Sequence, residues 1–410
     1  MSERILTFEQ ALIEVISHGR MVTKVDRAET VALPGAAGRV LAGPVVADRD
    51  QPPFDRSTRD GYALRAEDSQ RALRVVGSLR AGQRWDGAAL GVDEAVEIMT
   101  GAAVPAGADA VVMVEHAAVA EGLLRVEAGR SLRRGENVVV RGAEAVGGGV
   151  VLPQGRVLEA AEIAVAASCG FSRVEVFQRP KVAIVATGDE LVELDKAMDE
   201  WQIRNSNSYA LEALVNATGG VGERLEIARD TVESLQARVE QGRKLDLLLL
   251  TGGVSMGKYD LVEQVLSEAG AEVFFTGALI QPGKPIVFGR LPKLGSVGWT
   301  YFFGLPGNPV STQVCFHLFV APMLRALAGG SMIAPQFVEA RLAEDVKGGA
   351  RVTRFLPAEL TGGWDGVSVR AVGWQGSGDV AANARGNCYV VLPAGVEAFV
   401  AGETVRVLLR

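Results

Sequence analysis

The stretch LDLLLLTGGVSMGKYD, residues 245–260, has the pattern of a buried strand, a glycine turn and a helix start. The apolar run 247–250 lacks the alternation of a half-exposed strand, so it predicts a strand buried on both faces of a parallel sheet. Gly252 and Gly253 follow, and apolar residues recur at helical spacing from Leu261. Ligands of such sheets bind beyond the carboxyl ends of the strands, where N–H groups at glycines can cradle an anion. A tight turn without a ligand explains these glycines equally well.

Composition narrows the class of protein. The chain has 410 residues, more than one ordinary core holds, and a net charge of −7, which gives no general attraction to nucleic acid or anionic membranes. No unbroken apolar run reaches the roughly 18 residues of a membrane span, and the N-terminus MSERILTFEQ lacks a signal-peptide pattern. The three cysteines form no metal or redox motif. These features predict a cytoplasmic protein without a nucleic-acid or membrane partner.

The order of patterns predicts an α/β multidomain protein. Residues 1–46 together with 143–180 are expected to form an N-terminal linker domain, and short β runs over 47–142 predict a small, mostly β domain. Strands and helices then alternate over 181–329, which predicts a doubly wound α/β domain. Short β runs over 330–410 predict a small C-terminal β domain.

Polar residues gather where the strands of the α/β domain end. Glu190, Asp230 and Asp260 could together hold Mg²⁺, which prefers oxygen ligands, and Lys284 offers a positive charge to an oxyanion. Simpler explanations exist for three of these residues. Asp230 and Asp260 each stand three residues before a glutamate and could be helix N-caps, and Lys284 could be a solvated loop charge. Only the concentration of these residues at consecutive strand ends favours a site.

Seven motifs, in this order, resemble the molybdopterin molybdotransferase family: RDGYA, IMTGA, ATGDEL, TGGVSMG, PGKP, GLPGNPVS and QGS. These bacterial molybdenum-insertion enzymes are similar to the E domain of gephyrin. The resemblance implies an elongated homodimer of four-domain subunits, with an α/β domain similar to the molybdopterin adenylyltransferase fold and a C-terminal β-barrel-like domain. The implied reaction hydrolyses adenylylated molybdopterin in the presence of Mg²⁺ and inserts molybdate into the dithiolene, releasing AMP. Molybdopterin adenylyltransferase itself is a possible partner.

The resemblance also implies roles for residues. Asp60 and Thr100 match an essential aspartate and threonine that face the partner subunit's α/β domain. Glu190, Asp230 and Asp260 match acidic positions near the pyrophosphate and Mg²⁺, and Lys284 matches a catalytic lysine. The expected substrate-binding residues are Thr187, Gly188, Gly252, Gly253, Ser255, Gly283, Pro306, Asn308, Ser311, Arg351 and Ser377.

The sequence departs from the family pattern at several positions. Gln281 stands where a lysine is usual and Asn205 where an aspartate is common. Val139, Val140, Ala143 and Gly378 also differ from the usual residues. A glutamine carries no charge, so weaker oxyanion binding is expected at position 281. A tungstate-inserting paralogue and a non-catalytic pterin-binding scaffold therefore remain alternatives to the molybdate-inserting enzyme, and a molybdopterin adenylyltransferase is a weaker one.

Overall fold

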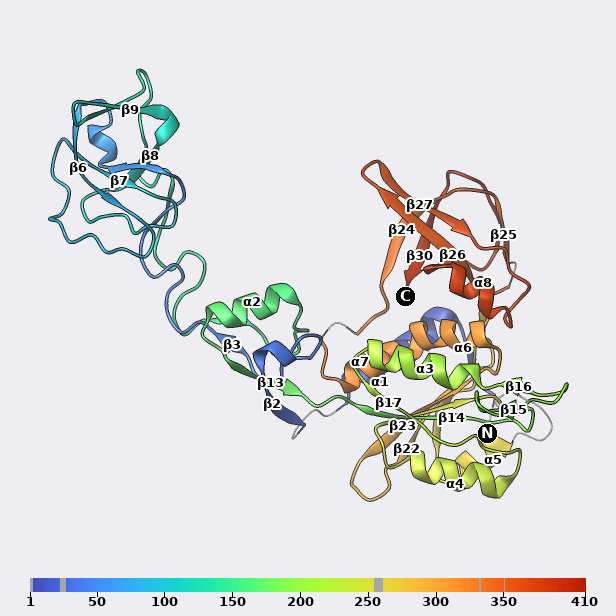
Figure 1. The fold of residues 1–410 in the computed structure, drawn as a ribbon. Helices are drawn as coiled ribbons and strands as arrows, with labels where there is room; N and C mark the ends of the chain where they lie inside the picture. The colour runs from blue at the N-terminus through green and yellow to red at the C-terminus, as the bar shows by residue number, and fades with distance from the viewer. Residues whose placement is uncertain (1–2, 23–26, 254–260, 332, 350) are drawn as a thin grey trace.

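The protein is elongated, with a small lobe of strands at one end and a larger body at the other (Figure 1). The computed structural model describes residues 3–22, 27–253, 261–331, 333–349 and 351–410. We name four parts: the small β lobe, the stem that joins it to the body, the α/β unit, and the C-terminal barrel that packs on the α/β unit. This arrangement confirms the α/β multidomain fold class predicted from the sequence.

The α/β unit is built on a six-stranded sheet in the order β17-β14-β18-β23-β22-β19. Strands β17, β14, β18 and β23 are parallel, β22 is antiparallel to β23, and β19 is antiparallel to β22. The strands are β17 (Val221–Arg224), β14 (Lys181–Ala186), β18 (Leu247–Thr251), β23 (Trp299–Leu305), β22 (Val287–Pro292) and β19 (Glu272–Phe275). Every residue of β18 is buried, as its unbroken apolar run predicts.

Helices cover both faces of this sheet, because alternate residues of each buried strand point to opposite sides. Leu247 and Leu249 pack under α3, α6 and α7, whereas Leu248 and Leu250 pack under α4 and α5. The helices are α3 (Ser206–Ala217), α4 (Val232–Gly242), α5 (Leu261–Glu268), α6 (Pro309–Cys315), the π-helical turn η4 (Phe316–Val320) and α7 (Ala321–Leu327). Two layers of helices around a mostly parallel sheet define a doubly wound unit.

The N-terminal helix α1 (Phe8–Arg20) also belongs to this packing. Thr7 and Gln10 form the capping box that begins it, and Ala11 and Val15 are fully buried against the core of the α/β unit. Just before it, β1 (Ile5–Leu6) pairs in parallel with β20 (Gly277–Ala278). The first residues of the chain therefore pack on the body, and the stem begins after them.

The stem consists of two short antiparallel ribbons and one helix. In one ribbon β2 (Ala28–Ala32) pairs with β13 (Arg173–Phe177), and in the other β3 (Val45–Val46) pairs with β12 (Val150–Leu152). The turn η1 (Leu33–Gly35) and the helix α2 (Ala160–Ser168) pack on them. Two segments far apart in sequence thus lie side by side and carry the chain out to the lobe and back.

The small β lobe is a six-stranded sheet in the order β8-β5-β7-β6-β10-β9. Its strands and turns are β5 (Gly61–Leu64), η2 (Ala66–Asp68), β6 (Leu73–Leu79), β7 (Glu94–Ile98), β8 (Ala110–Met113), η3 (Val114–His116), β9 (Ala117–Ala120) and β10 (Leu123–Val126). At its base β4 (Arg56–Ser57) pairs with β11 (Val138–Val139). Two apolar clusters, one on each face of the sheet, hold the lobe together.

The C-terminal barrel is a closed ring of five strands, β24-β30-β28-β26-β27, in which β27 pairs back to β24. The strands are β24 (Phe337–Leu342), β26 (Thr353–Gly363), β27 (Gly366–Ala371), β28 (Cys388–Leu392) and β30 (Thr404–Leu409). A smaller ribbon of β25 (Val346–Gly349) and β29 (Val396–Phe399) and the helix α8 (Val380–Arg385) complete it. From the α/β unit, β21 (Ile280–Gln281) pairs with β26 and so links the two parts.

One continuous helical stretch, Pro309–Leu327, is long and apolar enough to cross a membrane by length and composition. Of its apolar window, 83% is buried inside the protein. Burial of this kind is what the core helix of a folded domain shows, and the stretch corresponds to α6, η4 and α7 beneath the barrel.

Candidate active site

Three loops meet at the carboxyl edge of the parallel strands. They follow β14, β18 and β23, and strand pairing continues into them. The N–H of Thr187 donates to the carbonyl oxygen of Thr251 at 3.0 Å, and the N–H of Gly252 donates to that of Leu305 at 3.3 Å. The structure therefore brings the predicted residues of these three loops together, as expected for neighbouring parallel strands.

Glycine is required where these loops touch. Gly252 has a φ of +92°, and a Cβ there would lie 2.4 Å from the carbonyl oxygen of Thr187. Gly253 has a φ of +62°, and a Cβ there would lie 3.0 Å from the Cγ2 of Thr187. Side chains at these positions would force the strand ends apart, so the glycines serve the close approach of two loops.

Asn207, in the first turn of α3, ties two of the loops to each other. Its Nδ2 donates to the Oγ1 of Thr251 at 3.0 Å and to the carbonyl oxygen of Gly307 at 2.7 Å. The carbonyl oxygen of Pro306 accepts from the hydroxyls of Thr251 and Thr312, so it is engaged within the protein. The helix pattern that follows Asn207 predicted this residue as the N-cap, a role that Asn205 takes, so the sequence did not indicate Asn207 as a site residue.

Asp230 is not a helix N-cap. The N-cap of α4 is Thr231, whose hydroxyl accepts from the N–H of Ser234 at 3.2 Å. Asp230 instead accepts, through Oδ1, a hydrogen bond of 3.1 Å from the hydroxyl of Thr187. The capping explanation for this residue is therefore wrong, and its carboxylate lies beside the loop after β14.

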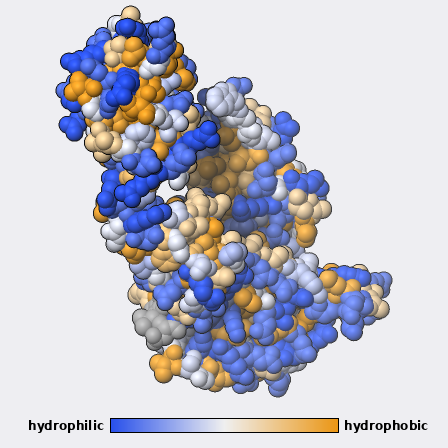
Figure 2. Space-filling view, turned by 60° about the vertical axis from the view of Figure 1, so that its left-hand side comes forward, coloured by the Kyte–Doolittle hydropathy of each residue, from blue (hydrophilic) through white to orange (hydrophobic). Residues whose placement is uncertain are grey.

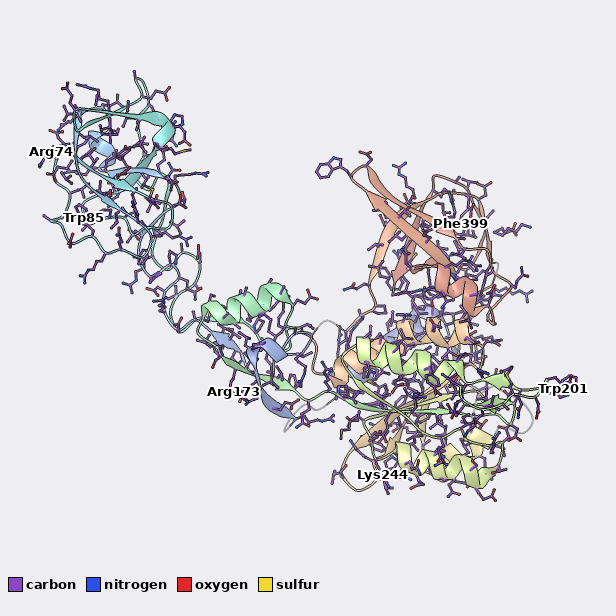
Figure 3. All side chains as sticks on the ribbon, in the orientation of Figure 1. Arg74, Trp85, Arg173, Trp201, Lys244 and Phe399 are labelled. Atoms are coloured by element: carbon purple, nitrogen blue, oxygen red, sulfur yellow. The ribbon has the colours of Figure 1, made fainter. Side chains whose placement is uncertain are left out.

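Glu190 borders the same loop. Gly188 has a φ of +148°, and a Cβ there would lie 2.4 Å from Oε2 of Glu190, so this carboxylate lies over the glycine backbone. The carbonyl oxygen of Glu190 accepts from the N–H of Ile203. That bond closes the base of a projecting segment between β15 (Leu191–Val192) and β16 (Ile203–Arg204), with Trp201 at its tip (Figure 3).

The oxygen donors at this loop fit a hard cation. Two carboxylates and the hydroxyl of Thr187 border one turn, and Mg²⁺ prefers such ligands and keeps several waters. Asp260, the third predicted ligand, and Ser255 lie outside the described residues. Among the residues that are described, no three His, Cys, Asp or Glu side chains gather into a metal-binding group.

The PGKP loop is fixed on the first helix after β23. Gly283 has a φ of +115°, and a Cβ there would lie 2.6 Å from the Sγ of Cys315. Burial raises the pKa of the Cys315 thiol, which stays protonated and donates to the carbonyl oxygen of Gly283. Lys284 is exposed, and its ammonium forms no ion pair within the described ranges.

The predicted residues of the barrel lie at two places beside these loops. The Nδ2 of Asn308 donates to the Oγ of Ser377 at 2.9 Å, and the N–H of Val310 donates to the carbonyl oxygen of Ser377 at 2.9 Å. Arg351 is exposed just before β26, the strand that pairs with Gln281. Ser311 is only 4% exposed, so its hydroxyl lies within the packing of α6 and not on the loop surface.

Asp60 and Thr100 form a close pair. Oδ1 of Asp60 accepts from the N–H of Thr100 at 2.6 Å and from its hydroxyl at 2.8 Å. These two hydrogen bonds, the backbone one first, lower the pKa of the Asp60 carboxyl, so it is a carboxylate at neutral pH. The pair lies on the small β lobe, far along the molecule from β14 and β18 (Figure 1). One chain by itself does not bring it to the strand-end loops.

Comparison with known proteins identifies the class of this architecture. Three family models match in order: the MoeA N-terminal region (domain I and II) over residues 6–170, the probable molybdopterin binding domain over 183–326, and the MoeA C-terminal region (domain IV) over 339–409. Among solved structures, the molybdopterin biosynthesis MoeA protein of Pyrococcus horikoshii superimposes with a TM-score of 0.80 at 27% identity. That likeness covers 99% of this chain and 100% of the other.

Curated relatives give the family. The molybdopterin molybdenumtransferase of Staphylococcus aureus strain MSSA476 is 36% identical over 388 residues, which are 93% of this chain and 90% of that protein. The protein of the same name from Staphylococcus epidermidis strain ATCC 12228 is 33% identical over 92% of this chain and 90% of its own length. The chain belongs to the molybdopterin molybdenumtransferase family, whose members are transferases of molybdenum cofactor biosynthesis.

Proposed function

We propose that the chain hydrolyses adenylylated molybdopterin and inserts molybdate into its dithiolene, with release of AMP. The observation that carries the proposal is the meeting of the loops after β14, β18 and β23, where two carboxylates border the Thr187–Gly188 turn. The substrate's pyrophosphate and the oxyanion are both negative, so their binding needs positive charge and N–H donors at one place. The Lys284 loop, held to the same α/β unit, offers that charge.

Different residues of the chain would bind the pyrophosphate, the oxyanion and Mg²⁺. The N–H groups of Thr187, Gly188 and Gly252 donate to backbone carbonyls within the protein, so the other backbone N–H groups of these loops would bind the pyrophosphate. Lys284 would draw the oxyanion towards it. Glu190 and Asp230, with Asp260, would hold Mg²⁺, which when bound would neutralise charge on the phosphoanhydride. Asn308, oriented by Ser377, would position the substrate at the start of α6. Asp60, kept as a carboxylate by Thr100, would orient the attacking group.

The separation of the Asp60–Thr100 pair from the other loops supports a homodimer. In it the small β lobe of each subunit would face the α/β unit of the other. Val114, whose N–H donates to the carbonyl oxygen of Asp60, leaves 50% of its surface exposed beside the pair. Figure 2 shows apolar residues gathered on one face of the lobe, ringed by hydrophilic ones. An exposed apolar patch of this kind is typical of an interaction surface.

The domains would span 1–46 with 143–180, 47–142, 181–329 and 330–410, with α1 docked on the third of them. The enzyme would work in the cytoplasm, and molybdopterin adenylyltransferase would be its supplier. The exposed glutamine at position 281 leaves tungstate as an alternative oxyanion.

A turnover assay tests the function. Purified protein would be incubated with adenylylated molybdopterin and Mg²⁺, with molybdate or tungstate in turn, and AMP and metal-bound cofactor would be measured. AMP release coupled to molybdate insertion is the expected result. Coupling to tungstate alone would favour the tungstate-inserting alternative. Tight pterin binding without AMP release with either oxyanion would make the protein a scaffold.

A further inference from the structure

Three arginines lie on the loops that surround the Asp60–Thr100 pair: Arg59, Arg80 and Arg84. All three are exposed, and in the described part of the chain none of their guanidinium groups forms an ion pair or a hydrogen bond. Several other arginines of the lobe pair with carboxylates, as in Arg56–Glu144, Arg71–Asp93, Arg74–Glu94 and Arg130–Glu136, whereas the exposed Arg125 and Arg133 form no ion pair in the described residues. The loops around Thr100 therefore carry three guanidinium groups against the exposed carboxylates of Asp60 and Asp86, and none of the three is ion-paired in the described residues.

Backbone contacts hold the three loops together. The N–H of Gly101 donates to the carbonyl oxygen of Ser57 at 2.9 Å, which joins the Thr100 turn to the Arg59 loop. The N–H of Met99 donates to the carbonyl oxygen of Leu79 at 3.0 Å, which joins the same turn to the strand that leads into Arg80. The Arg59 loop and the Arg80 loop thus both join the Thr100 turn, whose N–H donates to the Asp60 carboxylate.

The loop with Arg80 and Arg84 is internally braced. The N–H of Arg80 donates to the Oε1 of Gln83 at 3.0 Å, and the N–H of Gln83 donates to the carbonyl oxygen of Arg80 at 3.1 Å. Next along the chain, the indole N–H of Trp85 donates to the carbonyl oxygen of Ala88 at 2.9 Å, and its ring packs over Gly77. These contacts fix the backbone of the loop, so less backbone entropy is lost when its arginines bind a ligand.

We propose that Arg59, Arg80 and Arg84 form a binding site for a phosphate or pyrophosphate group of the substrate on the small β lobe. Guanidinium groups bind phosphate oxygens with paired N–H donors, and unpaired ones lose no existing partner when they do so. This inference rests on the proposed function, since in the dimer the lobe would meet the substrate opposite the partner's α/β loops. It adds a second cationic binding site, on the lobe, to the one at Lys284.

Calorimetry on the full-length dimer tests this site, with AMP and inorganic pyrophosphate as separate probes. The variant is Arg59→Gln/Arg80→Gln/Arg84→Gln. The control is Arg125→Gln, an exposed arginine of the same lobe with no ion pair in the described residues, on β10 beside the far end of β6. The triple variant should bind at least one probe about ten-fold more weakly or worse, while the control binds as wild type does. The affinity of the triple variant should also depend less on salt concentration, since fewer charges take part in binding.

The outcomes separate cleanly. If the triple variant loses affinity for pyrophosphate alone, the arginines bind the pyrophosphate group of the substrate. If it loses affinity for AMP alone, they bind the nucleotide half. Unchanged affinity for both probes in a folded dimer overturns the proposal. Dissociation into monomers without a change in affinity also overturns it, because the arginines would then hold the partner subunit. Binding is measured without turnover, so this result does not depend on which oxyanion the enzyme inserts.

Discussion

At the scale of single residues, an exposed cation on a loop that the body holds in place is the candidate for contact with an anionic substrate. Lys284 is such a residue: its loop is fixed by Gly283 and Cys315, and its ammonium is exposed. We expect Lys284→Ala to weaken molybdate binding about ten-fold, as for loss of a hydrogen bond to a charged group, and AMP binding much less. Calorimetry with each ligand measures both.

Lys244→Ala is the matched control for this prediction. Lys244 is also exposed, but it precedes β18 at the opposite edge of the sheet (Figure 3). This variant should bind both ligands as wild type does. If Lys284→Ala loses affinity for molybdate and AMP equally, Lys284 binds the phosphate of the substrate and not the oxyanion.

The side chain at position 281 is exposed while its backbone pairs with Arg354, so it can be exchanged without disturbing a strand. Gln281→Lys should tighten oxyanion binding by about ten-fold, because a second cation adds on the order of 1–3 kcal/mol. Gln281→Glu should weaken it. Dissociation constants at two ionic strengths show whether the gain shrinks with salt. Identical binding by all three proteins would place residue 281 away from the oxyanion.

Asp60 provides a pH test at the same scale. Thr100 lowers its pKa below the ordinary 3.8, so its stabilising interaction is present above that value and is lost as the pH falls through the folded-state pKa. Thr100→Val removes the hydroxyl bond and keeps the N–H bond, so the Asp60 pKa should rise part of the way back. Carboxyl titration by NMR measures this, with Thr100→Ser as a control that keeps the low pKa. An unchanged pKa in Thr100→Val would mean that the hydroxyl does not contribute.

At the scale of elements, the site depends on how closely the loops after neighbouring strands approach. Gly252→Ala would place a Cβ 2.4 Å from the Thr187 carbonyl oxygen at a φ of +92°. Strain of this kind costs about 1–3 kcal/mol, so a lower melting temperature and loss of pterin binding are expected. Gly307→Ala is the control, because its Cβ would meet nothing closer than 3.6 Å. Equal melting temperatures for both variants would show that the loops can separate at little cost.

Much of the arrangement of strands and loops in the α/β unit was predictable from the sequence. The apolar run 247–250 indicated a strand buried on both faces, and its alternate leucines pack on two layers of helices as such a strand must. The convergence of Thr187, Gly252 and Asn308 followed from the parallel order of their strands.

Other features could not be predicted because they depend on contacts between distant segments. Periodicity did not show that α1 packs on α7, since an apolar helix face indicates that the helix is packed but not on which element. Asp230 has the spacing of an N-cap, yet Thr231 takes that role. Both residue types cap helices, so only the conformation of the loop decides between these neighbours. The burial of Ser311 inside α6 and the two hydrogen bonds of Asn207 are likewise properties of the packed loops.

At the scale of the whole molecule, the elongated shape is the feature that matters most for function. The stem holds the Asp60–Thr100 pair away from the strand-end loops of its own chain (Figure 1). If both groups act on one substrate, the second subunit must supply one of them. Two-fold symmetry would then create two equivalent sites, each with a lobe from one subunit and an α/β unit from the other.

The activity of a mixed dimer tests this claim most directly. Asp60→Asn subunits with one affinity tag and Lys284→Ala subunits with another would be co-expressed, and the heterodimer isolated through both tags. One of its two sites then carries both changes and the other carries neither, so we expect about half of the wild-type rate of AMP release coupled to molybdate insertion. Molybdate is held well below its dissociation constant, so that the weaker binding of Lys284→Ala limits the rate, and each parent homodimer should then keep only a small part of the wild-type rate. A heterodimer no more active than its parents would contradict a site shared between subunits.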